Sequence, residues 1–185
     1  MIKETQQIYL SSINKDKFKN IFYVEEIQTP IASMLAIADS DYLYACIFES
    51  DSAIKTIEGL LKTYSAKIVF KGNKITQLTN SQLDKYFNKE LKSFSIPSKL
   101  TGTDFQKQVW QELREIPYGK TISYLEEAKN MDKPTAFRAV ANANGKNLFP
   151  IIIPCHRVIA SNGKLGGYTG GLDKKKYLLN LEKST

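Results

Sequence analysis

The stretch "SYLEEAKNMDKPTAFRAVANAN", residues 123–144, contains two short helical patterns separated by a tight turn. Ser123 and Glu126 have the spacing of a capping box, which predicts that a helix begins at residue 124. Pro134 suits the first turn of the second helix, because the N–H that proline lacks is not needed there. The stretch therefore predicts a helix-turn-helix.

The second helical pattern is rich in small residues. Ala136, Ala139, Ala141 and Ala143 would let the helix backbone approach a partner closely, and Arg138 is the long cationic side chain in its middle. In a DNA-binding protein such a helix lies in a groove. Small residues also allow close helix packing inside a core, and on the pattern alone this second interpretation is favoured, since helical hairpins are common in many folds.

The segment just before this stretch predicts a longer amphipathic helix. Thr103 and Gln106 form a further capping box, and Phe105, Val109 and Leu113 recur every four residues along one face. Such a face is expected to pack against the core of the domain.

Residues 93–103, "SFSIPSKLTGT", are polar and broken by proline and glycine, so we interpret them as a linker. The chain before the linker has the β-forming and helical runs of a small sheet with one or two helices. Strands are expected at 20–27, 32–38, 42–48 and 66–70, and helices at 50–65 and from a capping box at Thr79 and Gln82. We predict an α+β protein with two domains, residues 1–98 and 99–185.

The segment "PIIIPCHRV", residues 150–158, places Cys155 beside His156, the one histidine of the chain. Its apolar start predicts a buried strand that Pro154 ends. A neighbouring imidazole can take the thiol proton, and the thiolate is the nucleophilic form, but only a turn or a water would bring the two side chains together. On the dipeptide alone, an inert cysteine beside a packed histidine is the favoured interpretation.

Five of the ten glycines follow in "SNGKLGGYTGGL", residues 161–172. Glycine permits positive φ and close approach of the backbone to a ligand. The segment is either a flexible surface loop or the wall of a pocket, and its position directly after the thiol favours the wall.

The composition excludes several classes of protein. The two cysteines, Cys46 and Cys155, cannot form a disulfide framework, and we expect Cys46 to be a buried structural thiol. No metal motif is evident, no apolar run reaches membrane-spanning length, and the start of the chain lacks a signal-peptide core, so we expect a cytoplasmic protein, nucleoid-associated if bacterial. The formal net charge is +7. This charge is expected of a protein that binds a polyanion such as nucleic acid, and equally of any protein from an organism whose proteins are rich in lysine.

Four segments together resemble the O6-alkylguanine-DNA alkyltransferase family. "FQKQVWQELREIPYGKTISY", "RAVANANGKN", "IPCHRV" and "GGYTGGL…LLNLE" occur in this order and spacing, and "PCHRV" in this setting is highly specific. The resemblance extends more weakly back to about residue 31, and residues 1–25 have no counterpart. It implies a ribonuclease-H-like N-terminal domain and a winged-helix-like C-terminal domain.

The resemblance implies direct-reversal DNA repair, in which the alkyl group of O6-alkylguanine, with O4-alkylthymine as a further candidate, moves irreversibly to a cysteine in one turnover. Cys155 would be the nucleophile, His156 its base through a water, and Glu182 the group that orients His156. Tyr124 would help to rotate the nucleotide and donate a proton to the departing guanine, while Asn147 would support the turn around the thiol.

The resemblance also implies that the helix-turn-helix enters the minor groove of duplex DNA and that the lesion is flipped into a pocket. Arg138 would replace the extruded base in the stack. The remaining DNA-binding positions are Lys133, Ala136 and Ala139. The pocket positions are Pro150, Val158, Tyr168 and Thr169. We expect double-stranded DNA as the partner of a monomer that needs no cofactor, metal or membrane.

Two residues depart from the family pattern. Leu148 stands where Asn147 is often followed by proline, and Phe137 is bulkier than the residue usual before Arg138. Two other functions remain open: a sensor that binds alkylated DNA without reacting, and a cysteine hydrolase that uses Cys155 and His156 over many turnovers.

Overall fold

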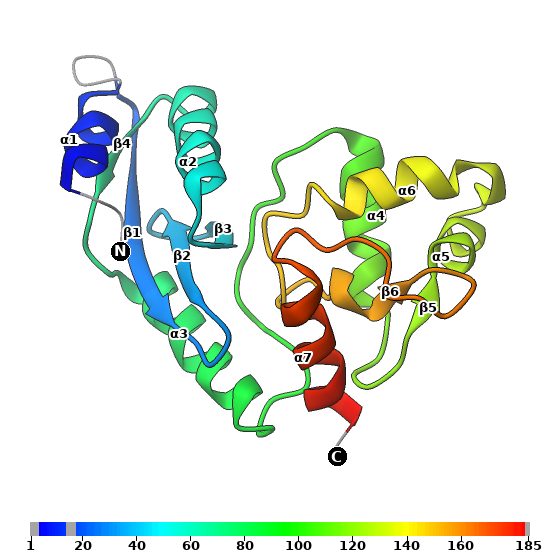
Figure 1. Ribbon diagram of the computed structural model, residues 1–185. Helices are drawn as coiled ribbons and strands as arrows, with labels where there is room; N and C mark the ends of the chain where they lie inside the picture. The colour runs from blue at the N-terminus through cyan, green and yellow to red at the C-terminus, as the bar shows by residue number, and fades with distance from the viewer. Residues whose placement is uncertain (1–3, 14–17, 184–185) are drawn as a thin grey trace. The chain divides into compact units, whose positions relative to one another are not determined.

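The computed structural model describes residues 4–13 and 18–183. The chain divides into two compact units, Met1–Lys99 and Leu100–Thr185. The predicted α+β class, with the sheet in the N-terminal part and the helices mostly in the C-terminal part, is confirmed (Figure 1).

The N-terminal unit contains a four-stranded sheet in the order β3-β2-β1-β4. Its strands are β1 (Asn20–Gln28), β2 (Ser33–Ala38), β3 (Leu43–Phe48) and β4 (Ala66–Val69). β1, β2 and β3 are antiparallel neighbours, and β4 pairs with β1 in parallel after a helical crossover. All four strands lie where the β-forming runs predicted them.

Helices cover the sheet: α1 (Glu4–Ser12), α2 (Asp51–Thr63) and α3 (Lys74–Phe87). α2 packs against β3 and β4, and α3 against β1 and β2. Consecutive residues Met34 to Ala38 of β2 are all buried, so both faces of that strand are covered. Cys46 on β3 has no exposed surface, and burial raises the pKa of its thiol to about 12, as expected of a structural cysteine.

The start of α3 was predicted wrongly. The helix begins after Asn73, whose side chain accepts hydrogen bonds from the backbone N–H groups of Ile75 and Thr76, and Thr76 completes the capping box. Thr79 instead lies inside the helix, where its hydroxyl donates to the carbonyl of Ile75 at 2.8 Å. Asparagine caps helices as well as threonine does, so two adjacent candidate caps competed and the earlier one forms.

Parts of the segments predicted as linker and unmatched extension belong to the sheet. Ser98 forms a parallel bridge with Leu43, whose N–H donates to the Pro97 carbonyl at 2.8 Å. Within residues 1–25, the structure shows α1 and the first part of β1. The sheet therefore extends into both segments.

The C-terminal unit is built from short elements around one core. Its helices are α4 (Asp104–Arg114), α5 (Tyr124–Asn130), η1 (Pro134–Ala136), α6 (Phe137–Asn144), η2 (Cys155–Arg157) and α7 (Leu172–Lys183). The strands β5 (Ile122–Ser123) and β6 (Val158–Ile159) pair in parallel. Figure 1 shows α4 and α6 side by side, in agreement with their contacts.

The helix-turn-helix is confirmed as α5, a turn containing η1, and α6. The capping boxes predicted at Thr103 and Ser123 both form, with Gln106 and Glu126 as the returning side chains. Trp110 of α4 is buried and donates from its indole nitrogen to the Ala143 carbonyl at 2.9 Å, which fixes α6 against α4. The small residue at position 143 thus serves core packing.

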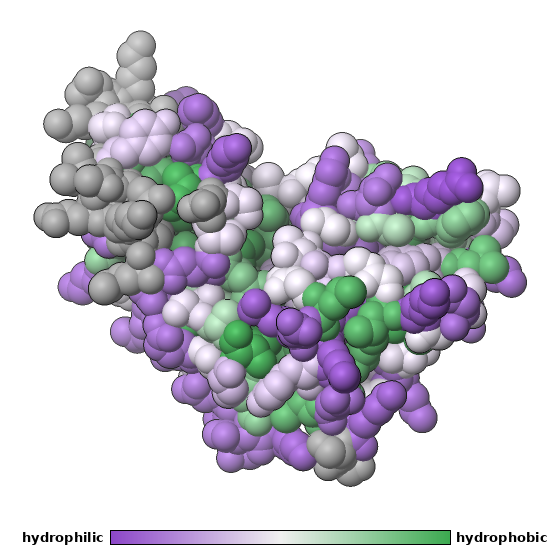
Figure 2. Space-filling model, in the orientation of Figure 1, coloured by the Kyte–Doolittle hydropathy of each residue, from purple (hydrophilic) through white to green (hydrophobic). Residues whose placement is uncertain are grey.

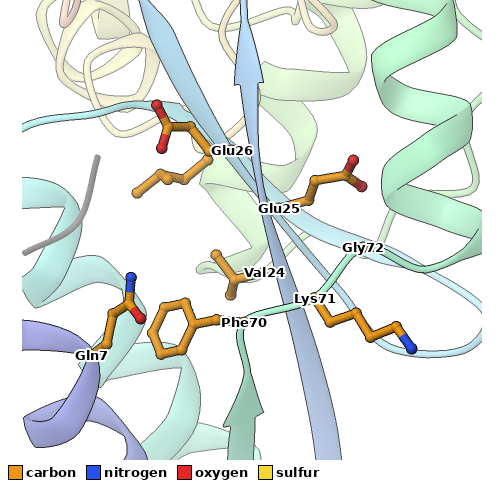
Figure 3. Close-up of a pocket in the computed structure, with 8 residues that line it drawn as sticks. Gln7, Val24, Glu25, Glu26, Phe70, Lys71 and Gly72 are labelled. Carbon is orange, nitrogen blue, oxygen red and sulfur yellow. The ribbon is translucent and has the colours of Figure 1, made fainter. Parts of the chain in front are cut away.

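A cavity of about 290 Å³ lies within the N-terminal unit (Figure 3). Glu25 and Glu26 are adjacent on β1 and point to opposite sides of the strand in this view. The cavity is lined by Gln7, Val24, Glu25, Glu26, Leu35, Phe70, Lys71 and Gly72. It contains none of the residues predicted to form the reactive site.

The face of the molecule seen in Figure 2 is mostly hydrophilic, with hydrophobic residues scattered over it. Exposed large hydrophobic side chains in the described residues include Phe137, Leu172 and Tyr177 of the C-terminal unit. In residues 4–13 and 18–183, no helix combines the length and the apolar character needed to span a bilayer.

Candidate active site

The thiol lies on a turn, so the strand predicted for residues 150–154 is wrong. The N–H of Ile153 donates to the Phe149 carbonyl at 2.8 Å, and Ile151 has a φ of 75°. A positive φ is strained for a β-branched residue, and it persists here where the isoleucine is fully buried. An apolar run that is buried in an irregular turn cannot be distinguished from a buried strand by its composition.

Asn147 holds this turn together. Its side-chain oxygen accepts from the N–H of Phe149 at 2.9 Å, and its amide nitrogen donates to the carbonyl of Ile153 at 2.9 Å. The same nitrogen lies 3.3 Å from the sulfur of Cys155. These contacts form although Leu148, and not proline, follows Asn147.

Cys155 opens the short helix η2 and is 6% exposed. Burial raises the pKa of its thiol to about 11, and the hydrogen bond from Asn147 opposes this rise only in part. At neutral pH the thiol is therefore protonated, and any nucleophilic role requires a base that removes its proton.

His156 follows in η2 and is fully buried. Its Nε2 lies 2.8 Å from Oε1 of Glu182 on α7. Because an ionised carboxylate only accepts hydrogen bonds, Nε2 carries the ring hydrogen and Nδ1 keeps its lone pair. Nδ1 has no hydrogen-bond partner among the described residues, and burial lowers the pKa of His156 below its usual value, so the ring is a neutral base.

Among the described residues, Gly119, His156 and Arg157 hold the Glu182 carboxylate by hydrogen bonds. Arg157 donates from Nε to Oε2 at 2.9 Å and from Nη2 to Oε1 at 3.0 Å, and the N–H of Gly119 donates to Oε2 at 3.0 Å. His156 donates from Nε2 to Oε1 at 2.8 Å. Burial alone would raise the pKa of Glu182, but the bonds from His156 and Arg157 outweigh it and lower that pKa to about 2. The carboxylate therefore stays ionised and fixes the imidazole.

Tyr124 is the first residue of α5 and lies against the glycine-rich loop. Its hydroxyl is 3.4 Å from the Gly167 carbonyl. A Cβ at Gly166, which has a φ of 68°, would lie only 2.9 Å from the Tyr124 ring. The loop therefore packs closely against the tyrosine, which glycine alone permits at position 166. Burial raises the pKa of Tyr124, and the nearby Cys155 and Glu127 add to the rise.

Lys175 on α7 also holds this loop. Its ammonium group donates to the Val158 carbonyl at 2.6 Å and to the Gly167 carbonyl at 3.2 Å, and the side chain has no exposed surface. Burial lowers its pKa to about 8 in spite of the opposing effect of Cys155.

The four predicted pocket residues lie around the same turn and loop. Pro150 and Val158 are buried, and the Thr169 hydroxyl donates to the Gly145 carbonyl at 3.0 Å. Burial raises the pKa of Tyr168 well above its usual value, and the nearby Cys155 and Glu182 add to it, which places the Tyr168 phenol near the reactive groups.

The predicted DNA-binding residues lie on the exposed side of the helix-turn-helix. Lys133, Arg138 and Ala139 are exposed and Ala136 is partly so. The Arg138 guanidinium lies 5.6 Å from the ring centre of Phe137, a residue that is 40% exposed. These side chains are separate from the buried group around Cys155.

Sequence reasoning missed two buried cations, Arg157 and Lys175. Arg157 follows His156 directly, and its place in "PCHRV" was a usable signal. Lys175 is the middle of three consecutive lysines, and nothing in the sequence distinguishes it from its exposed neighbour Lys176. In the part of the chain that the structure describes, no cluster of three or more His, Cys, Asp or Glu side chains could hold a metal ion.

Comparison with known proteins connects this geometry to a family. Residues 104–184 match the family model described as the 6-O-methylguanine DNA methyltransferase, DNA binding domain. A Methanosarcina acetivorans protein named methylated-DNA–protein-cysteine methyltransferase is 57% identical over 103 residues, which are 56% of this chain and 66% of that protein. A Methanosarcina mazei protein of the same name is 41% identical over 162 residues, 88% of this chain and 98% of that protein.

A solved structure agrees with these relatives. The crystal structure of Mycobacterium tuberculosis OGT in complex with DNA is similar with a TM-score of 0.76 and 37% identity, covering 88% of this chain and 93% of that one. The similarity thus extends over both units of the chain, beyond the segment around the thiol. The chain belongs to the methylated-DNA–protein-cysteine methyltransferase family.

Proposed function

We propose that this protein repairs DNA by direct reversal, moving the alkyl group of O6-alkylguanine to Cys155 once per molecule. The observation that carries the proposal is the buried arrangement around the thiol, in which Glu182 fixes the neutral imidazole of His156, the residue that follows Cys155 in the chain. The family membership of the chain and the exposed cationic helix-turn-helix support it.

In the proposed reaction, the sulfur of Cys155 gives its proton through a water to Nδ1 of His156. The thiolate then attacks the alkyl carbon, the new C–S bond forms, and the C–O6 bond breaks with its electron pair returning to the guanine. Tyr124 supplies a proton to that base and is reprotonated through water by the imidazolium, so the proton of the thiol ends on the guanine. A positive charge develops on the imidazole, and the Glu182 carboxylate stabilises it.

The product is a thioether, and no group in the site would cleave it. Burial that protects the thiol before reaction also shields the product from water. The protein is therefore a stoichiometric acceptor, and the reaction needs no cofactor or metal.

Duplex DNA is the proposed partner. Arg138 and Lys133 are exposed cations on the helix-turn-helix, while Ala136 and Ala139 leave room for a groove to approach. Arg138 would fill the gap that a flipped guanine leaves. The flipped base would lie between Tyr124, Tyr168, Thr169, Pro150 and Val158.

The test is Cys155→Ser assayed with duplex DNA that holds one labelled O6-methylguanine. The variant should bind the duplex like the wild type and accept no label, while the wild type accepts one label per molecule. Label on the variant, or more than one turnover by the wild type, would contradict the proposal. Multiple turnovers on an ester would favour the cysteine hydrolase, and tight lesion binding without transfer by the wild type would favour the sensor.

A further inference from the structure

Glu127 on α5 and Asn144 on α6 form a buried polar pair between the two helices of the helix-turn-helix. Glu127 has no exposed surface and Asn144 is 5% exposed. The amide nitrogen of Asn144 donates to Oε2 of Glu127 at 2.7 Å. The reaction proposed above uses neither residue.

The other oxygen of each side chain has no protein partner. Oε1 of Glu127 and Oδ1 of Asn144 are both buried and unpartnered among the described residues. An ionised carboxylate and an amide oxygen both accept, so an ionised Glu127 would leave two buried acceptors unsatisfied. A proton on Oε1 would supply the missing donor, and a carboxylic acid and a primary amide can then form two antiparallel hydrogen bonds.

The surroundings also oppose a charge on Glu127. In the described part of the chain, the titratable groups that interact electrostatically with Glu127 are Glu112 on α4, Tyr124 on its own helix and Cys155 on η2, and none of these is a cation. Burial raises the pKa of Glu127 to about 8, against the effect of the Asn144 hydrogen bond and with that of Glu112. A buried carboxylate without a cation is held in its neutral form.

The pair connects to the thiol through the backbone. The carbonyl of Asn144 accepts from the N–H of Asn147 at 3.2 Å, and Asn147 lies 3.3 Å from the sulfur of Cys155 through its amide nitrogen. Asn144 is the last residue of α6, and Asn147, which holds the turn around the thiol, is hydrogen-bonded to it. A change in the position of Asn144 is transmitted to Cys155 by one intervening residue.

We propose that Glu127 is a positioning residue that carries a proton, closes an acid–amide pair with Asn144, and thereby fixes the end of α6 from which Asn147 holds Cys155. This inference rests on the proposed function only in using alkyl transfer to Cys155 as a readout. Ionisation of Glu127 removes the proton on Oε1, so the pair keeps the hydrogen bond from the Asn144 amide but loses the second one. It also places a negative charge near a thiol that must itself become negative.

The first test compares the wild type with Glu127→Gln. Glutamine restores both hydrogen bonds of the pair with an amide and cannot ionise. The readout is the rate of Cys155 alkylation by free O6-benzylguanine, which needs no DNA, from pH 6.5 to 9. The ratio of the variant rate to the wild-type rate should be about 1 at pH 6.5 and rise several-fold by pH 9, reaching roughly tenfold if the ionised form does not react. A ratio that stays flat would overturn the proposal.

The matched control is Glu126→Gln, the adjacent glutamate, which is exposed on the same helix. Glutamine also completes a capping box, so this variant keeps the start of α5. Its ratio to the wild type should stay flat over the same range. A rise equal to that of Glu127→Gln would overturn the assignment to Glu127.

A direct measurement separates this inference from the proposed function. The side-chain carboxyl carbon of Glu127, assigned by its loss in Glu127→Gln, should titrate near pH 8 in a 13C NMR series. A signal that is fully ionised at pH 6 would overturn the proposal, whether or not Cys155 accepts an alkyl group. Absence of alkylation with a titration near pH 8 would instead contradict the proposed function alone.

The positioning role has its own readout. Glu127→Ala should slow alkylation at pH 6.5, and Glu127→Gln should restore it. Equal rates for Glu127→Ala and the wild type would overturn the link from the pair to the thiol. If Glu127→Ala does not fold, Asn144→Leu, which removes the amide partner, takes its place with the same expected loss.

Discussion

Cys155 combines two properties that oppose each other at a single residue. Burial protects the thiol from other reactions, and the same burial raises its pKa to about 11. In the proposed reaction, the neutral imidazole of His156, fixed by Glu182 at 2.8 Å, resolves the conflict by taking the proton when substrate is bound. Reactivity at this site therefore depends on groups that hold a base, and the pKa of the free thiol is not a measure of it.

Glu182→Gln should reduce both alkyl transfer and stability. The buried Arg157 guanidinium would lose its charged partner, which costs about 3 kcal/mol, and His156 would lose the carboxylate that stabilises its protonated form. Thermal unfolding should shift down by several degrees, and the rate of Cys155 alkylation should fall. Unchanged unfolding and an unchanged rate would refute the role of this carboxylate.

The loss of stability at acidic pH should also depend on Glu182. Its pKa in the folded protein is about 2, below the usual value of 4.5, so its stabilising effect is complete above pH 4.5 and is lost as the pH falls toward 2. The free energy of unfolding of the wild type, measured with urea, should therefore decrease as the pH falls through this range. Glu182→Gln should lack this part of the pH dependence. If the variant and the wild type lose stability equally at low pH, another group causes the loss.

At the residue scale, the resemblance implied that Glu182 lies beside His156 and Asn147 near Cys155, and the structure shows both contacts. Lys175, Glu127 and their contacts could not be predicted. A lysine in a run of three and a glutamate in a helical pattern are both expected to be exposed to solvent. Their burial could not be predicted because it depends on partners that are distant in the sequence.

At the scale of elements, local signals predicted those helices whose caps are unambiguous. α4 and α5 begin at their predicted capping boxes, whereas α3 begins six residues before its predicted cap because Asn73 caps it instead. The turn at residues 150–153 was predicted as a strand, since its conformation is imposed by the Asn147 side chain and not by its own isoleucines. Side-chain contacts of this kind leave no periodic signal.

Arg138, on the exposed side of the helix-turn-helix, should contribute to repair of duplex DNA but not to the chemistry at Cys155. Arg138→Ala should slow transfer from O6-methylguanine in a duplex by roughly tenfold, because stacking of a side chain in place of a base is worth about 1–3 kcal/mol. Its reaction with free O6-benzylguanine should be unchanged, since Arg138 is exposed and separate from Cys155. Equal losses on both substrates would contradict the base-flipping role.

At the scale of the whole molecule, the net charge of +7 predicts how binding responds to salt. Each phosphate contact contributes a slope of about −0.9 to the dependence of log affinity on log salt concentration. Duplex affinity should therefore fall steeply between low and moderate salt, while the reaction with free O6-benzylguanine should change little. An affinity independent of salt would mean that the lysine excess reflects composition and not a DNA surface.

The α+β class and the four strands of the N-terminal sheet were accessible from the sequence because each domain has its own periodicity, whereas α1 and the two-residue strands β5 and β6 were not predicted. The extent of the sheet was harder to predict, because Ser98 joins it from a segment that is polar and contains proline. Pairing at a sheet edge is set by the neighbouring strand, so a short segment there carries little signal of its own.

The most direct measurement is intact-protein and peptide mass spectrometry after the protein is mixed with duplex DNA that contains one O6-methylguanine. The account predicts one added methyl group per protein, saturating at that value and located on the peptide that holds Cys155. A protein that stays unmodified, or one that carries the methyl group on Cys46 or another residue, would contradict it.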